Sequence, residues 1–115
     1  MSHPYRMHIT IEGHHQEHEL AIKNAAEARW PFHEWWSSMH RAEISAEGDG
    51  VLSNTMPPHE YADELAVGVW QANGGDFCMI EVAATRWEKA PCDSGTQTCI
   101  LDEYDFARLM KAATV

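Results

Sequence analysis

The segment from Ala28 to Met39, ARWPFHEWWSSM, constrains the fold most strongly because it holds three of the five tryptophans. A buried large aromatic side chain removes about 150–250 Å² from water. Pro31 suits the first turn of a helix, where its missing N–H costs nothing. The large apolar side chains that follow recur at spacings of three and four, which predicts one helical stripe of Phe32, Trp35, Trp36 and Met39. We therefore expect a short aromatic helix that organises the core.

The chain before this segment predicts a strand and then a helix. Apolar and polar residues alternate from Tyr5 to Glu12, which is typical of a half-buried strand, and Gly13 ends it. From His14 to Trp30 we expect a helix that breaks near Trp30, with a shared face of Leu20, Ala21, Asn24, Ala25 and Ala28. A second strand is the alternative, because Leu20 and Ile22 also alternate. The alanine-rich stretch at 25–29 favours the helix.

The middle of the chain predicts a hairpin and a second long helix. Glu43–Ala46 and Val51–Thr55 read as short strands joined by Gly48-Asp49-Gly50, whose glycines tolerate positive φ. Pro57 and Pro58 open a helix that runs to about Ala72 and ends at Asn73-Gly74-Gly75. Its expected core stripe is Tyr61, Leu65, Gly68, Val69 and Ala72.

The last third predicts two strands and a helix. Asp76–Trp87 reads as a strand with either Phe77 and Met79 or Cys78 and Ile80 turned inward, and Thr96–Leu101 as its partner. Asp102 and Asp105 resemble a capping box for a final helix that buries Phe106, Leu109 and Met110. The whole order, β-α-α-β-β-α-β-β-α, predicts a single α+β domain over residues 1–115. We expect an antiparallel sheet of four to five strands with three to four helices packed on it.

Composition predicts a soluble protein with reduced thiols. No apolar run approaches the roughly 20 residues that span a bilayer, and the N-terminus is polar. The odd count of three cysteines argues against a complete disulfide framework. Cys78 reads as an inert core thiol. Cys92 and Cys99 flank a probable turn, so a disulfide between them is the alternative to two reduced thiols.

The formal charge of −10 disfavours direct contact with nucleic acid and favours basic surfaces. The carboxylates form three local clusters in the sequence: Glu43, Glu47 and Asp49; Glu60, Asp63 and Glu64; Asp102, Glu103 and Asp105. We hypothesise that some of these converge on one face and imitate the phosphate rows of nucleic acid, so that the face fills a basic groove of a partner. The alternative is that they keep the protein soluble and oppose helix dipoles.

Histidine is frequent, with eight residues, and GHHQEHE is the densest group. If this group is helical, His14 and His18 share a face and can chelate zinc with a third ligand from His8, His33 or Glu12. The group lacks the glutamate of a zinc-protease HEXXH motif. His33 and His40 read as the polar edge of the aromatic helix. Hydrolase, P-loop and dinucleotide-binding motifs are absent from the sequence.

The size, acidity, tryptophan-rich core and closing LDEYDFARLMKAA together resemble small phage-encoded anti-defence proteins, notably anti-CRISPR proteins. The likeness is one of general character and assigns no role to any single residue. It implies a stoichiometric inhibitor in the cytoplasm of a bacterial host that binds a CRISPR effector complex and blocks target DNA binding, without catalysis or cofactor. The alternatives are a small zinc protein or zinc enzyme that uses His14 and His18, and a dimerisation module that uses Trp70 or Trp87.

Overall fold

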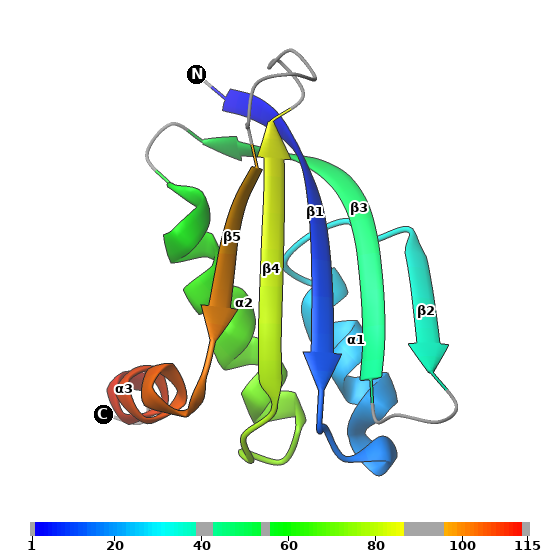
Figure 1. Ribbon diagram of the computed structural model, residues 1–115, viewed down its shortest axis with the longest axis vertical. Helices are drawn as coiled ribbons and strands as arrows, with labels where there is room; N and C mark the ends of the chain where they lie inside the picture. Colours follow the sequence, from blue (N-terminus) through cyan, green and yellow to red (C-terminus); the bar gives the residue numbers. More distant parts are fainter. Residues whose placement is uncertain (1, 39–42, 54–55, 87–95, 114–115) are drawn as a thin grey trace.

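Strand β1 lies at the centre of a five-stranded antiparallel sheet whose order is β2-β3-β1-β4-β5 (Figure 1). The computed structural model describes residues 2–38, 43–53, 56–86 and 96–113. The strands are β1 (Ser2–Glu12), β2 (Glu34–Ser38), β3 (Glu43–Ser53), β4 (Met79–Arg86) and β5 (Thr96–Leu101). The helices are a 3₁₀ turn η1 (Gln16–His18), α1 (Glu19–Glu27), α2 (Pro58–Ala72) and α3 (Glu103–Ala113). A five-stranded sheet with three α-helices confirms the predicted α+β class.

The connectivity explains how the central strands come together. Leaving out the short turn η1, the elements from β1 to β4 follow the order β-α-β-β-α-β. Both α1 and α2 lie on one face of the sheet (Figure 1). Each helix therefore connects two strands with a third strand inserted between them, which is the split βαβ arrangement of ferredoxin-like folds. Strand β5 and helix α3 extend this unit at the β4 edge. A fold of this kind serves many unrelated functions, so it identifies none.

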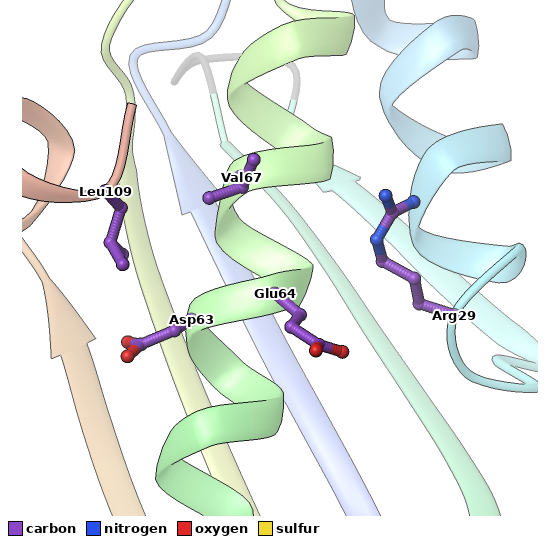
Figure 2. Close-up of a pocket in the computed structure, with 5 residues that line it drawn as sticks. All are labelled: Arg29, Asp63, Glu64, Val67 and Leu109. Atoms are coloured by element: carbon purple, nitrogen blue, oxygen red, sulfur yellow. The ribbon is translucent and has the colours of Figure 1, made fainter. Parts of the chain in front are cut away.

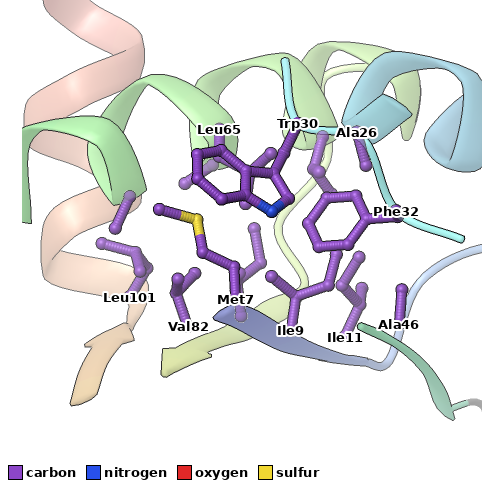
Figure 3. Close-up of a cluster of buried hydrophobic side chains, with 14 of the residues drawn as sticks. Met7, Ile9, Ile11, Ala26, Trp30, Phe32, Ala46, Leu65, Val82 and Leu101 are labelled. Atoms are coloured by element: carbon purple, nitrogen blue, oxygen red, sulfur yellow. The ribbon is translucent and has the colours of Figure 1, made fainter. Parts of the chain in front are cut away.

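The core lies between the sheet and the helices α1 and α2 (Figure 3). The predicted alternation in β1 is confirmed, because Tyr5, Met7, Ile9 and Ile11 are all buried. Trp30 lies over these side chains with 2% of its surface exposed, and its indole N–H donates to the carbonyl of Gly48 at 2.9 Å. The paired indole nitrogen makes burial of this large ring favourable.

The predicted aromatic helix is wrong. Glu34–Ser38 forms the edge strand β2, which pairs with β3 and turns Trp35 and Trp36 to opposite faces of the sheet. Trp35 is half-buried on the helix side, where its indole donates to Glu27 at 2.9 Å, whereas Trp36 is 45% exposed on the other side. Pairing with β3 holds residues 34–38 in an extended conformation. Tryptophan is compatible with this conformation because it packs well on a pleated surface. Met39 and His40 lie outside the described residues.

The predicted hairpin at Gly48-Asp49-Gly50 is also wrong. Strand β3 runs without interruption from Glu43 to Ser53 and pairs with β1 over its full length. Neither glycine has positive φ. They are glycines because the chain crosses closely above them: a Cβ on Gly48 would lie 2.3 Å from the Pro31 carbonyl oxygen, and one on Gly50 would lie 2.7 Å from the Trp30 ring.

Helix α1 is shorter than predicted and buries a different face. It begins at Glu19, after η1, and ends at Glu27, so the alternative of a second strand is wrong and the break before Pro31 is confirmed. Ile22 and Ala26 are fully buried, while Leu20 is 71% exposed and Ala21, Asn24 and Ala28 are also exposed. The sequence has no strong apolar stripe in this helix, so it did not predict which face of the helix packs on the sheet.

Most expectations for α2, β4 and α3 are confirmed. Leu65, Gly68 and Val69 are buried, and the N–H of Gly75 caps α2 by donating to the carbonyl of Trp70 at 2.9 Å. Strand β4 begins at Met79, not at Asp76 as predicted, and its inward face is that of Ile80, with Cys78 buried just before the strand. The capping box forms, with the N–H of Asp105 donating to the Asp102 carboxylate at 3.1 Å. Phe106, Leu109 and Met110 pack against the core and are half-buried.

Of the two tryptophans proposed for a dimer surface, Trp70 is not exposed. Trp70 is fully buried, and its indole N–H donates to the carbonyl of Cys78 at 2.9 Å. Phe106 of α3 packs edge-on against it, with 5.1 Å between ring centroids. This contact anchors α3 to the rest of the core. Trp87, the other tryptophan considered, lies outside the described residues.

Candidate interaction surface

The face of the sheet opposite α1 and α2 is not covered by any described helix, and it is acidic (Figure 1). Side chains alternate along a strand, so the register of the five strands identifies which ones share this face. Six carboxylates face solvent here and form what we call the acidic sheet face: Glu12, Glu34, Glu43, Glu47, Asp49 and Glu81. Arg6 is the one guanidinium among the described residues of this face.

Two pairs of glutamates on this face stand directly opposite each other on neighbouring strands. Glu12 of β1 faces Glu43 of β3, and Glu34 of β2 faces Glu47 of β3. Like charges in directly opposed positions destabilise a sheet, by up to about 1 kcal/mol for each pair. Natural sheets usually avoid like charges in directly opposed positions. Each pair is therefore expected to destabilise the sheet slightly, and Arg6 beside Glu47 offsets part of this cost in the second pair.

Arg6 offsets part of this charge. It makes a two-point contact with Asp49 at 2.8 and 3.3 Å, and its Nε lies 3.2 Å from Glu47. The hydrogen bond to Asp49, together with the nearby acidic charges, raises the pKa of Arg6. The arginine is thus held between two carboxylates, and the remaining four acids of the acidic sheet face stay in excess.

An aromatic platform adjoins these acids. The rings of His8 and Trp36 stack with 6.0 Å between centroids and 30° between planes. His8 Nδ1 also lies 3.9 Å from a carboxylate oxygen of Glu47. An exposed indole beside carboxylates suits an arginine side chain, because a guanidinium binds carboxylates in a fork and stacks on aromatic faces.

The other two predicted clusters meet each other on the helix side. Arg108 of α3 lies 3.1 Å from Asp105 and 3.9 Å from Asp63 of α2, so it bridges the clusters. Burial raises the pKa of Asp63, and the charge of Arg108 opposes that rise. Asp102 and Asp105 form the α3 capping box, and Glu60 lies in the first turn of α2. Glu60, Asp102 and Asp105 therefore lie at helix starts, as the alternative interpretation proposed, whereas Asp63 lies in the second turn of α2.

The three clusters do not all converge. Glu43, Glu47 and Asp49 lie on the acidic sheet face, whereas the α2 and α3 clusters lie together in the helical layer. Four further residues of this face, Glu12, Glu34, Glu81 and Trp36, were not predicted from the sequence to belong to it. The alternation of β1 could have revealed Glu12. Glu34 and Trp36 were hidden because their segment was predicted to be helical.

A pocket of about 290 Å³ opens above α2 (Figure 2). Asp63 points to one side of the helix and Glu64 to the other, toward Arg29 of the α1–β2 connection. The Arg29 guanidinium lies over Gly68, where a Cβ would come within 2.5 Å of it. Val67 and Leu109 supply the apolar lining. The described lining brings charges of both signs together without a nucleophile and base in contact.

The histidine group is not helical where the zinc hypothesis needed it to be. His14 precedes η1, so His14 and His18 do not share one helical face. His14 is buried beside Glu19, with Nε2 3.2 Å from its carboxylate, while His15 contacts Asp76 at 2.8 Å. Within the described ranges, no three His, Cys, Asp or Glu side chains are placed to hold a metal ion.

Cys78 is expected to be chemically inert in the native protein. Its side chain is buried, and desolvation raises its pKa to about 12. Since the thiolate is the reactive form, its population at pH 8 falls roughly a thousand-fold below that of an ordinary thiol. In a Cys92→Ser/Cys99→Ser variant, labelling by a thiol reagent should be at least about 100-fold slower in buffer than in denaturant. Equal rates would contradict the burial of Cys78.

Among the described residues, Cys78 and Cys99 are free thiols, as the prediction of reduced cysteines expected. Cys92 lies outside those residues. None of the described helices is long and apolar enough to cross a membrane. Comparison with protein families, with curated proteins and with solved structures finds no match to this chain.

Proposed function

We propose that this protein is a non-enzymatic binding protein whose acidic sheet face docks on a cationic, nucleic-acid-binding surface of another protein. The observation that carries the proposal is the two pairs of directly opposed glutamates, Glu12 with Glu43 and Glu34 with Glu47, on a sheet face that no described helix covers and that includes Trp36. A cationic partner would remove the repulsion within each pair. Binding would therefore release a cost that the free protein carries.

The choice of this face over the helix side rests on what the acids do in the free protein. On the helix side, Asp63 and Asp105 flank Arg108, and Asp102 caps α3. Asp102 and Asp105 stabilise the folded chain without a partner, and Arg108 offsets part of the desolvation of Asp63. On the acidic sheet face, Arg6 is surrounded by an excess of acids. The groups that gain most from an external cation are therefore on the sheet.

The class of partner follows from charge and from the resemblance to anti-defence proteins. A basic groove that ordinarily holds phosphates would accept a flat acidic sheet, and occupying it would exclude the nucleic acid. A CRISPR effector complex in a bacterial cytoplasm is the partner that the resemblance implies. In this proposal inhibition is stoichiometric, and no cofactor takes part.

The deciding variant is Glu34→Gln/Glu43→Gln, which removes one carboxylate from each opposed pair. We expect it to raise the free energy of unfolding by about 0.5–1 kcal/mol, because both like-charge contacts disappear. We expect the same variant to bind a nine-residue arginine peptide about ten-fold more weakly. Urea denaturation and fluorescence titration at about 50 mM salt measure the two effects, and binding should weaken further at higher salt. A gain in stability together with a loss of binding marks a functional surface.

The matched control is Glu60→Gln/Glu64→Gln, which makes the same change of charge on α2. It should leave peptide affinity within about two-fold and lower stability slightly, since Glu60 lies in the first turn of the helix. If the control weakens binding as much as the sheet variant, net charge alone is responsible and the proposed face is wrong. Proteins captured from bacterial lysate by the wild-type chain should include nucleic-acid-binding proteins that duplex DNA displaces.

A further inference from the structure

The pocket above α2 contains an arginine that the fold holds in place (Figure 2). Arg29 Nη1 donates to the carbonyl of Ala25 at 3.1 Å, and a Cβ added at Gly68 would lie 2.5 Å from the guanidinium carbon. The glycine therefore makes room for the guanidinium against the helix. Among the described residues, no carboxylate lies within 4.0 Å of this guanidinium. Arg29 therefore keeps N–H donors for an anion from outside the chain.

Two carboxylates of the same pocket point to opposite sides of α2 (Figure 2). Glu64 is exposed, lies one helical turn before Gly68 and points toward Arg29, with which it forms no ion pair within 4.0 Å. Asp63 points the other way and has Arg108 at 3.9 Å. Desolvation raises the pKa of Asp63, because Arg108 at this distance offsets only part of the loss of water. Both carboxylates would therefore gain from a further cation.

Apolar side chains complete the lining. Val67 of α2 and Leu109 of α3 are half-buried and face a pocket whose volume is about 290 Å³. Ligand pockets of proteins range from about 300 to 1,000 Å³, so this one suits a ligand of amino-acid size. One guanidinium and two carboxylates give the lining a net charge of −1. The complementary ligand is therefore small and partly apolar, with one anionic group and two cationic groups.

We propose that this pocket binds a free basic α-amino acid with the size and charge of lysine. The ligand carboxylate binds Arg29 in a two-point contact, and the α-ammonium group lies at Glu64. The ligand side chain crosses α2 over Val67, and its terminal ammonium group reaches Asp63. Its methylene groups cover Val67 and Leu109, as lysine stems commonly cover apolar surface. The single net positive charge of the ligand then balances the charge of the lining.

Titration followed by the amide NMR signals of α2 tests each charged group of the ligand separately. Free lysine at neutral pH should shift the amides of Val67 and Gly68 with a Kd of about 1 mM. Three analogues each lack one group: 6-aminohexanoate lacks the α-ammonium, norleucine the terminal ammonium and 1,5-diaminopentane the carboxylate. Each should bind about two- to five-fold more weakly than lysine. Equal binding of lysine and 1,5-diaminopentane would reduce the effect to general attraction of cations and would overturn the proposal.

The variant Glu64→Gln tests the orientation of the ligand, with Glu60→Gln as the matched control. Both residues are exposed acids on α2, but Glu60 lies one turn earlier and outside the lining. Glu64→Gln should weaken lysine binding about two- to five-fold and leave 6-aminohexanoate binding unchanged, since that analogue has no α-ammonium group. Asp63→Asn should weaken lysine binding and leave norleucine binding unchanged. Equal effects of Glu64→Gln and Glu60→Gln on lysine binding, or no amide shift in the wild type up to about 20 mM lysine, would overturn the proposal.

The pocket does not rest on the proposed function, because it lies in the helical layer and the acidic sheet face lies on the other side of the sheet (Figure 1). The variant Glu34→Gln/Glu43→Gln should therefore leave lysine binding within about two-fold while it weakens binding of the arginine peptide. Loss of lysine binding in this variant would assign the amino acid to the acidic sheet face and would overturn the pocket assignment.

Discussion

Replacing Trp30 by alanine is expected to lower the free energy of unfolding by about 3–5 kcal/mol. The ring is almost fully buried, packs edge-on against Tyr61 with 5.4 Å between centroids, and donates its N–H to Gly48. The variant loses this packing and leaves the Gly48 carbonyl without its donor. Domains of this size are typically stable by only about 5–15 kcal/mol. A large fraction of the total stability should therefore disappear.

The control for Trp30 is Trp36→Ala, measured by urea denaturation followed by circular dichroism. Trp36 is 45% exposed and stacks on His8, so its loss should cost less than about 1 kcal/mol. An aromatic helix with one buried stripe would instead make Trp36 a core residue. Similar costs for the two variants would therefore contradict the strand assignment of Glu34–Ser38. Circular dichroism is the appropriate measurement because both substitutions alter tryptophan fluorescence.

Gly48→Ala is expected to destabilise the protein by about 2–3 kcal/mol, although alanine is the smallest side chain that can be added. The new methyl group would meet the Pro31 carbonyl oxygen at 2.3 Å and the Phe32 Cα at 2.7 Å. These are backbone atoms, so no rotamer change relieves the overlap. The crossing segment between α1 and β2 would have to lift from β3, and the Trp30 contact with Gly48 would be strained with it.

Val51→Ala on the same strand is the control for Gly48→Ala. Its side chain is 61% exposed, and we expect a change within about 0.5 kcal/mol. Amide hydrogen exchange adds a second measurement: β3 pairs with β1 through Gly48 to Gly50, so β1 amides opposite this stretch should be protected. Fast exchange there, with a small cost for Gly48→Ala, would favour a turn at these glycines.

The two wrong elements have a common cause. Glycine at 48 and 50 is typical of a tight turn, and the apolar spacing after Pro31 is typical of a helix, so local rules favoured both predictions. The structure places these two segments against each other. The glycines are small because Trp30 and Pro31 cross over them, and residues 34–38 are extended because β3 pairs with them. Neither segment contains the information about the other.

The sequence predicted the charge of the candidate surface but not its position in the fold. The charge of −10 indicated a cationic partner, and Glu43, Glu47 and Asp49 were recognised as a cluster. Their opposition to Glu12 and Glu34 depends on strand register, which is a long-range property. A register shift of one residue would turn these side chains to the other face. Sequence alone therefore left the choice between three acidic clusters open.

The sequence by itself determined the α+β class, the buried side of β1, the α2 helix with its glycine cap, and the Asp102 capping box. Each depends on periodicity or on contacts within a few residues, which local chemistry decides. Tertiary structure alone decided that β3 is continuous, that Trp36 faces solvent and that glutamates oppose each other across strands. Those features arise when segments distant in the chain pack together, since only the pairing of backbones fixes which side chains meet.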